Sequence, residues 1–217
     1  MQVTVVDYGI GNLFSVQRAL EHCGASVRVS SDASAIETAE RVVLPGVGAF
    51  ADGMRGLRER GLVEPLRRLA SAGRPLLGIC LGMQMLADVS EEFGEHQGLG
   101  LIPGRVVAIP RVDVFGHPQK IPHIGWNALV PAHDAPGTSP WAGTILSSTP
   151  LQTSVYLVHS FHFVPTSAAD RLADCVYGGH RITAAVQRGR LTGCQFHPEK
   201  SGEAGLAVLR AFIGAAQ

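Results

Sequence analysis

The stretch PLLGICLGMQML, from Pro75 to Leu86, contains an apolar run that ends at a cysteine between two glycines. The run PLLGIC is typical of a buried strand, and the apolar residues in LGMQMLADVS recur at a spacing that predicts a helix over 81–90. A buried strand that passes directly into a helix is the repeating unit of α/β folds. The stretch therefore predicts a parallel sheet covered by helices, with Cys80 at the carboxyl end of one strand.

The residues before this stretch repeat the alternation. Apolar and β-branched runs predict strands over 3–8, 26–30 and 41–46, and periodic patterns predict helices over 11–24 and 50–72, the second interrupted near Gly61. Parallel strands need crossover connections, which place helices on both faces of the sheet. The first half of the chain thus predicts a doubly covered parallel sheet.

After Gly94 the pattern changes to short strands separated by turns. Strands are predicted over 104–110, 123–130, 154–165, 173–179, 182–189 and 191–198, with a turn-rich loop over 131–143 and a final helix over 202–216. We therefore expect an α/β fold with a largely parallel central sheet flanked by helices and additional antiparallel strands in the C-terminal half. Residues 1–217 are expected to form a single domain.

Composition excludes several classes of protein. Lysine and arginine together number 18, as do aspartate and glutamate, so no basic excess favours nucleic-acid binding. No apolar run approaches the roughly 20 residues that a membrane span needs, and the N-terminus has no signal-peptide pattern. Cys23, Cys80, Cys175 and Cys194 lack metal-ligand spacing and are expected to be free thiols in a cytoplasmic protein.

The glycines around Cys80 suggest a nucleophile. A strand-to-helix turn with small flanking residues exposes one side chain at the mouth of the sheet, as in the nucleophile elbow of serine hydrolases. Cys80 would also face the positive end of the following helix, which stabilises a thiolate. The alternative is a buried structural cysteine whose neighbouring glycines permit close packing.

A cysteine nucleophile needs a base, and GCQFHPEKS (193–201) offers one. His197 and Glu199 are two residues apart, and the turn imposed by Pro198 would let the carboxylate reach the imidazole. The alternative is a histidine and a glutamate in an ordinary surface loop.

The segment LPGVGAF (44–50) also follows a predicted strand. Its glycines allow backbone N–H groups to point at a ligand and allow a peptide plane to turn over without Cβ strain, which suits an oxyanion hole. A simple strand-to-helix turn would have the same composition.

Taken in order, PGVGAF, GICLGMQ and QFHPEKS resemble the class I glutamine amidotransferases, which use a Cys-His-Glu triad. DYGIGN (7–12), PHIGWN (122–127) and GLGLIPGRV (98–106) are similar to the glutaminase subunits of imidazole glycerol phosphate synthases. This resemblance, which spans nearly the whole chain, implies hydrolysis of glutamine without a cofactor or a metal. It also implies a heterodimer with a (β/α)₈-barrel cyclase subunit, which receives ammonia through an internal channel in histidine biosynthesis.

The resemblance assigns roles to particular positions. It implies Cys80 as nucleophile, His197 as base and Glu199 as its orienting carboxylate. The implied oxyanion residues are Val47, Gly48 and Leu81, and the implied glutamine-binding residues are Gln84, Glu92, Ser160 and Phe161. Phe161 departs from the tyrosine often found there, so a hydroxyl contact is not expected. The implied interface or channel residues are Asn12, Trp126, Tyr156 and Lys200, which would otherwise be ordinary surface or packing residues.

The sequence is also compatible with other functions. A stand-alone γ-glutamyl hydrolase, or a glutaminase subunit of another synthase, would share the cysteine chemistry, but the hydrolase has no evident need for DYGIGN and PHIGWN. A non-catalytic scaffold would lack a member of the triad. His159 and His162 have HxxH spacing, but on one strand they would point to opposite faces, so no metal site is expected there. Met83 and Met85 are expected in the core.

Overall fold

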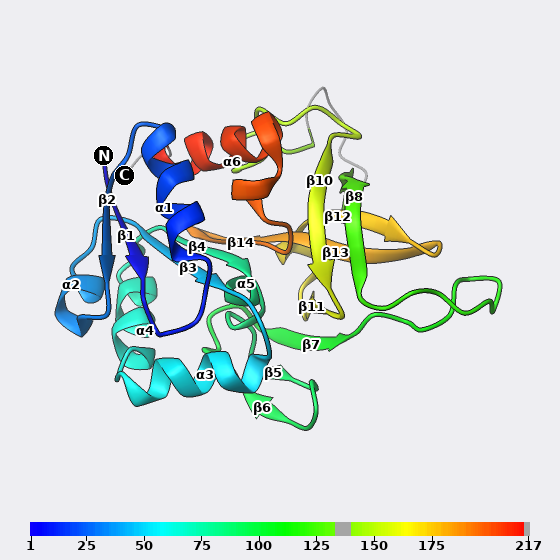
Figure 1. Ribbon diagram of the computed structural model, residues 1–217, viewed down its shortest axis with the longest axis horizontal. Helices are drawn as coiled ribbons and strands as arrows, with labels where there is room; N and C mark the ends of the chain where they lie inside the picture. The colour runs from blue at the N-terminus through cyan, green and yellow to red at the C-terminus, as the bar shows by residue number, and fades with distance from the viewer. Residues whose placement is uncertain (133–139, 215–217) are drawn as a thin grey trace.

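A sheet of eight strands, in the order β2-β1-β3-β4-β14-β13-β12-β9, runs through the computed structural model, which describes residues 1–132 and 140–214 (Figure 1). Strands β2, β1, β3, β4 and β14 are parallel to one another, whereas β13 is antiparallel to β14, and β12 and β9 continue the sheet in antiparallel pairs. The strands are β1 (Gln2–Val6), β2 (Ser26–Ser30), β3 (Val42–Gly46), β4 (Leu76–Cys80), β9 (Val130–Pro131), β12 (Arg171–Tyr177), β13 (His180–Arg188) and β14 (Leu191–Cys194). The predicted α/β class and the antiparallel strands of the C-terminal half are confirmed.

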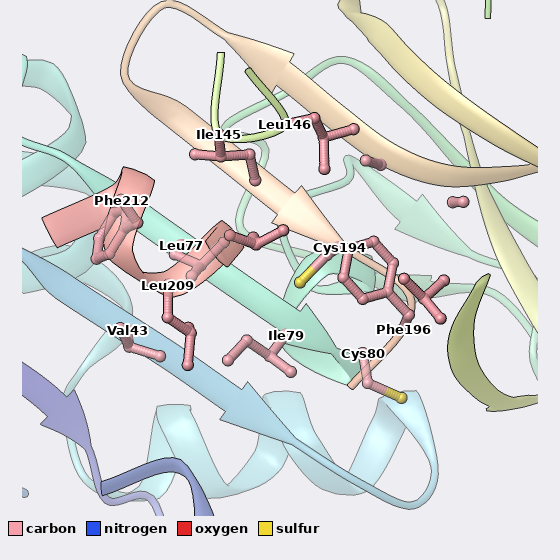
Figure 2. Close-up of a cluster of buried hydrophobic side chains, with 14 of the residues drawn as sticks. Val43, Leu77, Ile79, Cys80, Ile145, Leu146, Cys194, Phe196, Leu209 and Phe212 are labelled. Carbon is pink, nitrogen blue, oxygen red and sulfur yellow. The ribbon is translucent and has the colours of Figure 1, made fainter. Parts of the chain in front are cut away.

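Apolar side chains fill both faces of the parallel strands, because successive residues of a strand point to opposite sides. On one face, Val43, Leu77 and Ile79 pack with α6 (Gly202–Gly214) (Figure 2). The helix α1 (Leu13–His22) belongs to the same apolar cluster. On the other face, Leu44 and Leu76 pack with α2 (Ala33–Glu37), α3 (Phe50–Glu59) and α4 (Val63–Ser71). The predicted helix over 50–72 is thus confirmed, including its interruption near Gly61, while α2 was not predicted.

The predicted helix over 81–90 is wrong in its length. Only α5 (Leu81–Gln84) is helical, and β5 (Val89–Ser90) follows after turns. The carbonyls of Met85, Leu86 and Ala87 accept hydrogen bonds from backbone N–H groups of residues 99–102, at 2.9–3.0 Å, instead of continuing the helix. Residues 81–87 are buried all round, so tertiary contacts, not a solvent-facing pattern, decide the local structure.

The predicted strand over 154–165 is broken at Ser160. Its first part, β10 (Ser154–His159), pairs with β8 (His123–Ala128) in a separate ribbon. Its second part, β11 (Phe161–Pro165), pairs with β7 (Gly104–Ala108) in a small sheet completed by β5 and β6 (His96–Gln97). The break places Ser160 between two sheets, close to the end of β4.

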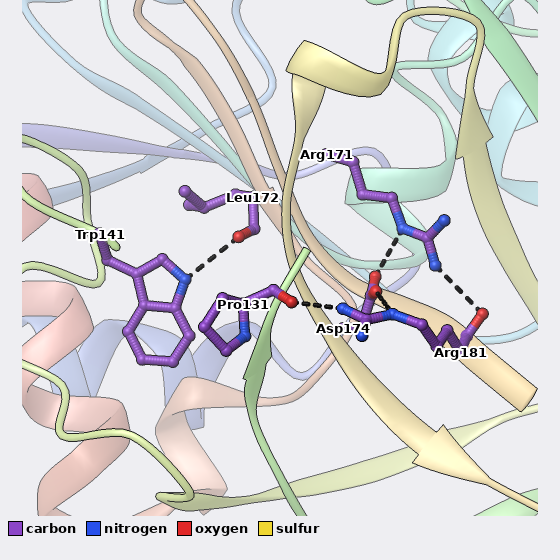
Figure 3. A network of polar contacts seen from close by, with 6 residues as sticks. All are labelled: Pro131, Trp141, Arg171, Leu172, Asp174 and Arg181. Atoms are coloured by element: carbon purple, nitrogen blue, oxygen red, sulfur yellow. Dashed lines mark hydrogen bonds and ion pairs between the residues drawn. The ribbon is translucent and has the colours of Figure 1, made fainter. Parts of the chain in front are cut away.

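A buried carboxylate fixes the antiparallel edge of the central sheet (Figure 3). Asp174 is fully buried and accepts hydrogen bonds from Arg171 Nε at 2.5 Å and Arg181 Nε at 2.7 Å. Arg181 also donates to the carbonyl of Pro131 on β9. The guanidinium groups of Arg171 and Arg181 therefore help to join β9, β12 and β13. We regard this network as structural.

Parts of two predictions fall on residues that the structure does not describe: most of the loop predicted over 131–143 and the last two residues of the helix predicted over 202–216. Within the described ranges, none of the helices has the length and apolar character needed to cross a membrane.

Candidate active site

Cys80 is the last residue of β4 and has a strained backbone. Its φ is 54° and its ψ is −110°, a conformation that residues other than glycine rarely adopt. The flanking glycines let the backbone pack closely around the turn. A Cβ on Gly78 would lie 2.7 Å from the carbonyl of Gly82, and a Cβ on Gly82 would collide with the Leu44 carbonyl oxygen. These are the features expected of a nucleophile elbow.

The helix after Cys80 begins at Leu81 as predicted, but it ends at Gln84. The dipole of so short a helix contributes little to stabilising a thiolate, so it explains less of the reactivity expected of Cys80 than the longer predicted helix would. The structure supplies a different partner, because Gln195 Nε2 lies 3.6 Å from Cys80 Sγ and donates to it. Gln195 is itself fully buried, and its Oε1 accepts from Gln84 Nε2 at 2.9 Å.

His197 and Glu199 lie a few residues after the end of β14, the strand beside β4. Residues Pro198–Lys200 form a single 3-10 turn, which brings Glu199 Oε1 to 2.8 Å from His197 Nδ1. Both side chains are almost completely buried. Two backbone contacts hold the turn in place: His197 N–H donates to the Tyr156 carbonyl at 3.0 Å, and Ser201 Oγ donates to the His197 carbonyl at 2.7 Å.

The protonation of His197 reflects these neighbours. Burial alone lowers the pKa of His197, but hydrogen bonds and charges of Cys80 and Glu199 outweigh burial and raise the pKa to about 9. The imidazole therefore interacts with Cys80 on one side and Glu199 on the other. This arrangement supports an imidazolium that faces the Cys80 sulfur, as a cysteine–histidine dyad requires.

A cavity of about 280 Å³ opens in front of Cys80. It gathers most of the residues predicted for the site, from segments that are far apart in the sequence. Its lining includes Val47, Gly48, Cys80, Leu81, Gln84, Glu92, Ser160, Phe161 and His197, together with Pro122, Val158 and His159. Glu199 stands behind His197 and does not reach this lining.

Two of the predicted glutamine-binding residues are held by backbone groups. Glu92 Oε2 accepts from the N–H of Phe50, the first residue of α3, at 2.6 Å. Gln84 Nε2 donates to the Phe161 carbonyl at 3.0 Å, which ties α5 to the rim of the cavity. Phe161 also makes an edge-to-face contact with the exposed ring of Phe93, with ring centroids 6.3 Å apart.

The segment predicted to form the oxyanion hole, residues 44–50, is called the oxyanion segment, and it has one packed end and one open end. Val47 is 38% exposed, and Gly48 has a φ of 90° with no atom near its missing Cβ. Gly46, in contrast, is completely enclosed, and Leu81 belongs to its surroundings.

Of the four predicted interface residues, Trp126 and Lys200 are exposed, and Tyr156 and Asn12 are half-buried. The exposed Trp126 pairs with Tyr156 across β8 and β10, with ring centroids 6.1 Å apart. Lys200 is exposed on the turn that follows His197. Asn12 Oδ1 accepts from Ser15 N at 3.4 Å at the start of α1.

Sequence reasoning missed Gln195, although it lies within the quoted GCQFHPEKS. It also missed the contribution of His159 to the cavity, because the strand break at Ser160 was not predicted. His159 Nδ1 contacts the Phe161 carbonyl at 2.9 Å, and burial lowers the pKa of His159 to about 3, so the ring is neutral. Met83 and Met85 are fully buried, and all four cysteines are free, as predicted.

Comparison with known proteins agrees with this geometry. A family model described as glutamine amidotransferase class-I matches residues 4–215. The imidazole glycerol phosphate synthase subunit HisH 1 of Legionella pneumophila (strain Lens) is 51% identical over 211 residues, covering 97% of this chain and 98% of that protein. The HisH subunit of Geobacillus kaustophilus (strain HTA426) is 44% identical over 214 residues, covering 99% and 97%.

Solved structures show the same fold at lower identity. The structure of PurLQS from Thermotoga maritima superimposes with a TM-score of 0.70 at 21% identity, covering 98% of this chain and 97% of that one. A glutamine amidotransferase from Thermotoga maritima gives a TM-score of 0.64 at 15% identity, covering 98% and 96%. The chain therefore belongs to the class I glutamine amidotransferases and, within them, to the HisH subunits of imidazole glycerol phosphate synthase.

Proposed function

We propose that this chain hydrolyses glutamine to glutamate and ammonia at Cys80 and delivers the ammonia to a cyclase subunit for histidine biosynthesis. The observation that carries the assignment of residues is the cavity in which Cys80 and His197 meet the oxyanion segment and the Glu92 carboxylate. Cys80 is the nucleophile, His197 the acid and base, and Glu199 the carboxylate that orients His197.

In the first half of the reaction, the Cys80 thiolate attacks the side-chain amide carbon of glutamine. The carbonyl oxygen becomes an oxyanion, which the backbone N–H groups of Leu81 and Val47 stabilise, with Gly48 giving the segment its freedom to turn. His197, protonated before the attack, gives its proton to the departing nitrogen. The C–N bond breaks, ammonia leaves and a γ-glutamyl thioester remains on Cys80.

In the second half, His197 is neutral and removes a proton from water. The resulting hydroxide attacks the thioester, the C–S bond breaks, and glutamate leaves with the Cys80 thiolate restored. Glu199 keeps the proton of the imidazole on Nδ1 during this step, so that Nε2 is free to act as the base.

The α-amino end of glutamine is expected to lie against Glu92. The Phe50 N–H binds Oε2 of that carboxylate and fixes its direction, which leaves Oε1 for the substrate ammonium. Ser160, Phe161 and Gln84 form the remaining wall.

The partner is proposed to be a (β/α)₈-barrel cyclase, in a cytoplasmic heterodimer. Trp126, Tyr156, Lys200 and Asn12 are the residues expected at the interface or at the entrance of the ammonia channel. A glutaminase that works only with its partner avoids wasting glutamine, and the open Val47–Gly48 end of the oxyanion segment suits such control.

Steady-state glutaminase kinetics on the lone chain and on the complex with its cyclase and nucleotide ligand test this proposal. We expect low activity from the lone chain and a large rise in kcat in the liganded complex, because an oxyanion donor acts mainly in the transition state. Full activity from the lone chain would favour a stand-alone hydrolase, and stimulation confined to KM would rule out gating through the oxyanion hole.

A further inference from the structure

The hydroxyl of Tyr8 reaches across the end of the sheet to the oxyanion segment. Tyr8 follows β1 and is completely buried, and its Oη donates to the carbonyl of Pro45 at 2.8 Å. Pro45 belongs to β3 and immediately precedes Gly46 and Val47. A side chain from the segment after the first strand therefore holds the peptide bond that leads into the proposed oxyanion hole.

Gly46 shows how closely this contact is fitted. A Cβ at Gly46 would collide with the Tyr8 hydroxyl oxygen and would lie 2.9 Å from Leu81 Cβ and 3.1 Å from Gly82 N. Gly46 is thus enclosed between the Tyr8 hydroxyl and the residues that follow Cys80. The position of its Cα relative to the nucleophile elbow depends on both neighbours.

The aromatic ring is fixed from the other side by α3. A Cβ at Gly56 would lie 2.7 Å from the Tyr8 carbonyl oxygen and 3.1 Å from its Cδ2, so the helix touches both the backbone and the ring. Burial raises the pKa of Tyr8 far above its usual value, and the nearby Cys80 acts in the same direction. The hydroxyl therefore stays protonated and remains a donor to Pro45.

The packing around the segment loosens immediately after this anchor. A peptide plane turns over by opposite rotations about the ψ of one residue and the φ of the next, while both Cα atoms stay in place. Gly46 is held by contacts, whereas Val47 is partly exposed and Gly48 is open. The peptide between Gly46 and Val47 is therefore the first one in the segment with freedom to turn.

We propose that Tyr8 is a positioning residue for catalysis, whose hydroxyl anchors the Pro45 carbonyl so that the Val47 N–H arrives at the correct place for the oxyanion. This inference rests on the proposed function of Val47 and Cys80. Without the hydroxyl, the Pro45–Gly46 peptide gains freedom, and the donor is misplaced in the transition state. Binding of glutamine and the nucleophilicity of Cys80 do not depend on this donor.

The test uses Tyr8→Phe in the complex with cyclase and its ligand, because phenylalanine keeps the ring and removes only the hydroxyl. Thr192→Val is the matched control: Thr192 Oγ1 also donates from a buried site to a strand carbonyl, that of Leu76, but at the opposite end of β4. Three quantities are measured for each variant: kcat and KM for glutamine, and the rate at which iodoacetamide alkylates Cys80. Alkylation forms no oxyanion, so it reports on the thiolate alone.

For Tyr8→Phe we expect kcat to fall about tenfold, less than the 10²–10³ typical of deleting an oxyanion donor, with KM and alkylation within about twofold of wild type. Thr192→Val should leave all three within about twofold. A kcat within about twofold of wild type, a change confined to KM, or an equal fall in kcat and alkylation would each overturn the inference. Tyr8→Leu, which also lacks the donor, is expected to lose at least as much kcat; wild-type kcat there would contradict the proposal too. Retained activity in Cys80→Ala would instead overturn the proposed function itself.

Discussion

Glu199 Oε1 lies 2.8 Å from His197 Nδ1, although only one residue, Pro198, separates the two along the chain. The contact forms because residues Pro198–Lys200 make a single 3-10 turn, and it is sealed from solvent, with side-chain exposures of 3% and 1%. A buried carboxylate at this place fixes the imidazole and supports its cationic form. The orientation of the base is therefore determined within three consecutive residues.

Glu199→Gln is expected to lower kcat for glutamine less severely than His197→Ala. The amide keeps some of the orienting contact but removes the negative charge, whereas alanine removes the acid and base altogether. Steady-state kinetics on both variants measure the difference, and Glu203→Gln, on the exposed side of α6, serves as the control for a neutralised carboxylate. An equal or larger loss in Glu199→Gln, with the fold intact, would assign Glu199 a direct chemical role.

The raised pKa of His197 predicts a pH dependence of stability. The folded pKa of about 9 exceeds the ordinary 6.5, so between these values the folded state binds a proton that the unfolded state has lost. The stabilisation is fully present below pH 6.5 and is lost as the pH rises to 9. Denaturant unfolding of wild type and of His197→Gln should show a difference in free energy that shrinks across this window, by up to roughly 1.4 kcal/mol per pH unit. A difference that stays constant or grows with pH would contradict the charged state of His197.

Gln195→Leu is expected to slow alkylation of Cys80 by iodoacetamide several-fold, because the Gln195 amide is a donor to the sulfur. It should also slow glutamine hydrolysis, since the same amide positions Gln84. The matched control is Gln187→Leu, an amide on β13 at the edge of a different cavity. Unchanged alkylation in Gln195→Leu would mean that the 3.6 Å contact does not stabilise the thiolate.

Local patterns predicted the parts of the site that depend on neighbours in sequence. The glycines around Cys80 and the pair His197 and Glu199 were recognisable because their geometry comes from one tight turn each. Gln195 was not recognisable, since its contacts are with Gln84 and Cys80, more than a hundred residues away.

The difference between local and distant contacts also explains the errors in the predicted fold. The apolar run over 154–165 contains no glycine at which a break would be expected, yet Ser160 divides it because β8 and β7 draw its two halves into different sheets. The helix that begins with α5 does not continue because loop N–H groups from residues 99–102 bind the carbonyls of the next three residues, 85–87. Neither event leaves a signal in the periodicity of side chains.

Covalent labelling shows whether glutamine reacts at Cys80. The complex with cyclase and its ligand is treated with a diazoketone analogue of glutamine, 6-diazo-5-oxo-norleucine, and the modified peptide is mapped by mass spectrometry. We predict modification at Cys80, protection by glutamine, and no label on Cys23, which is more exposed but has no histidine or glutamine side chain contacting its sulfur among the described contacts. Label on another residue, or label on Cys80 that glutamine does not prevent, would contradict the account.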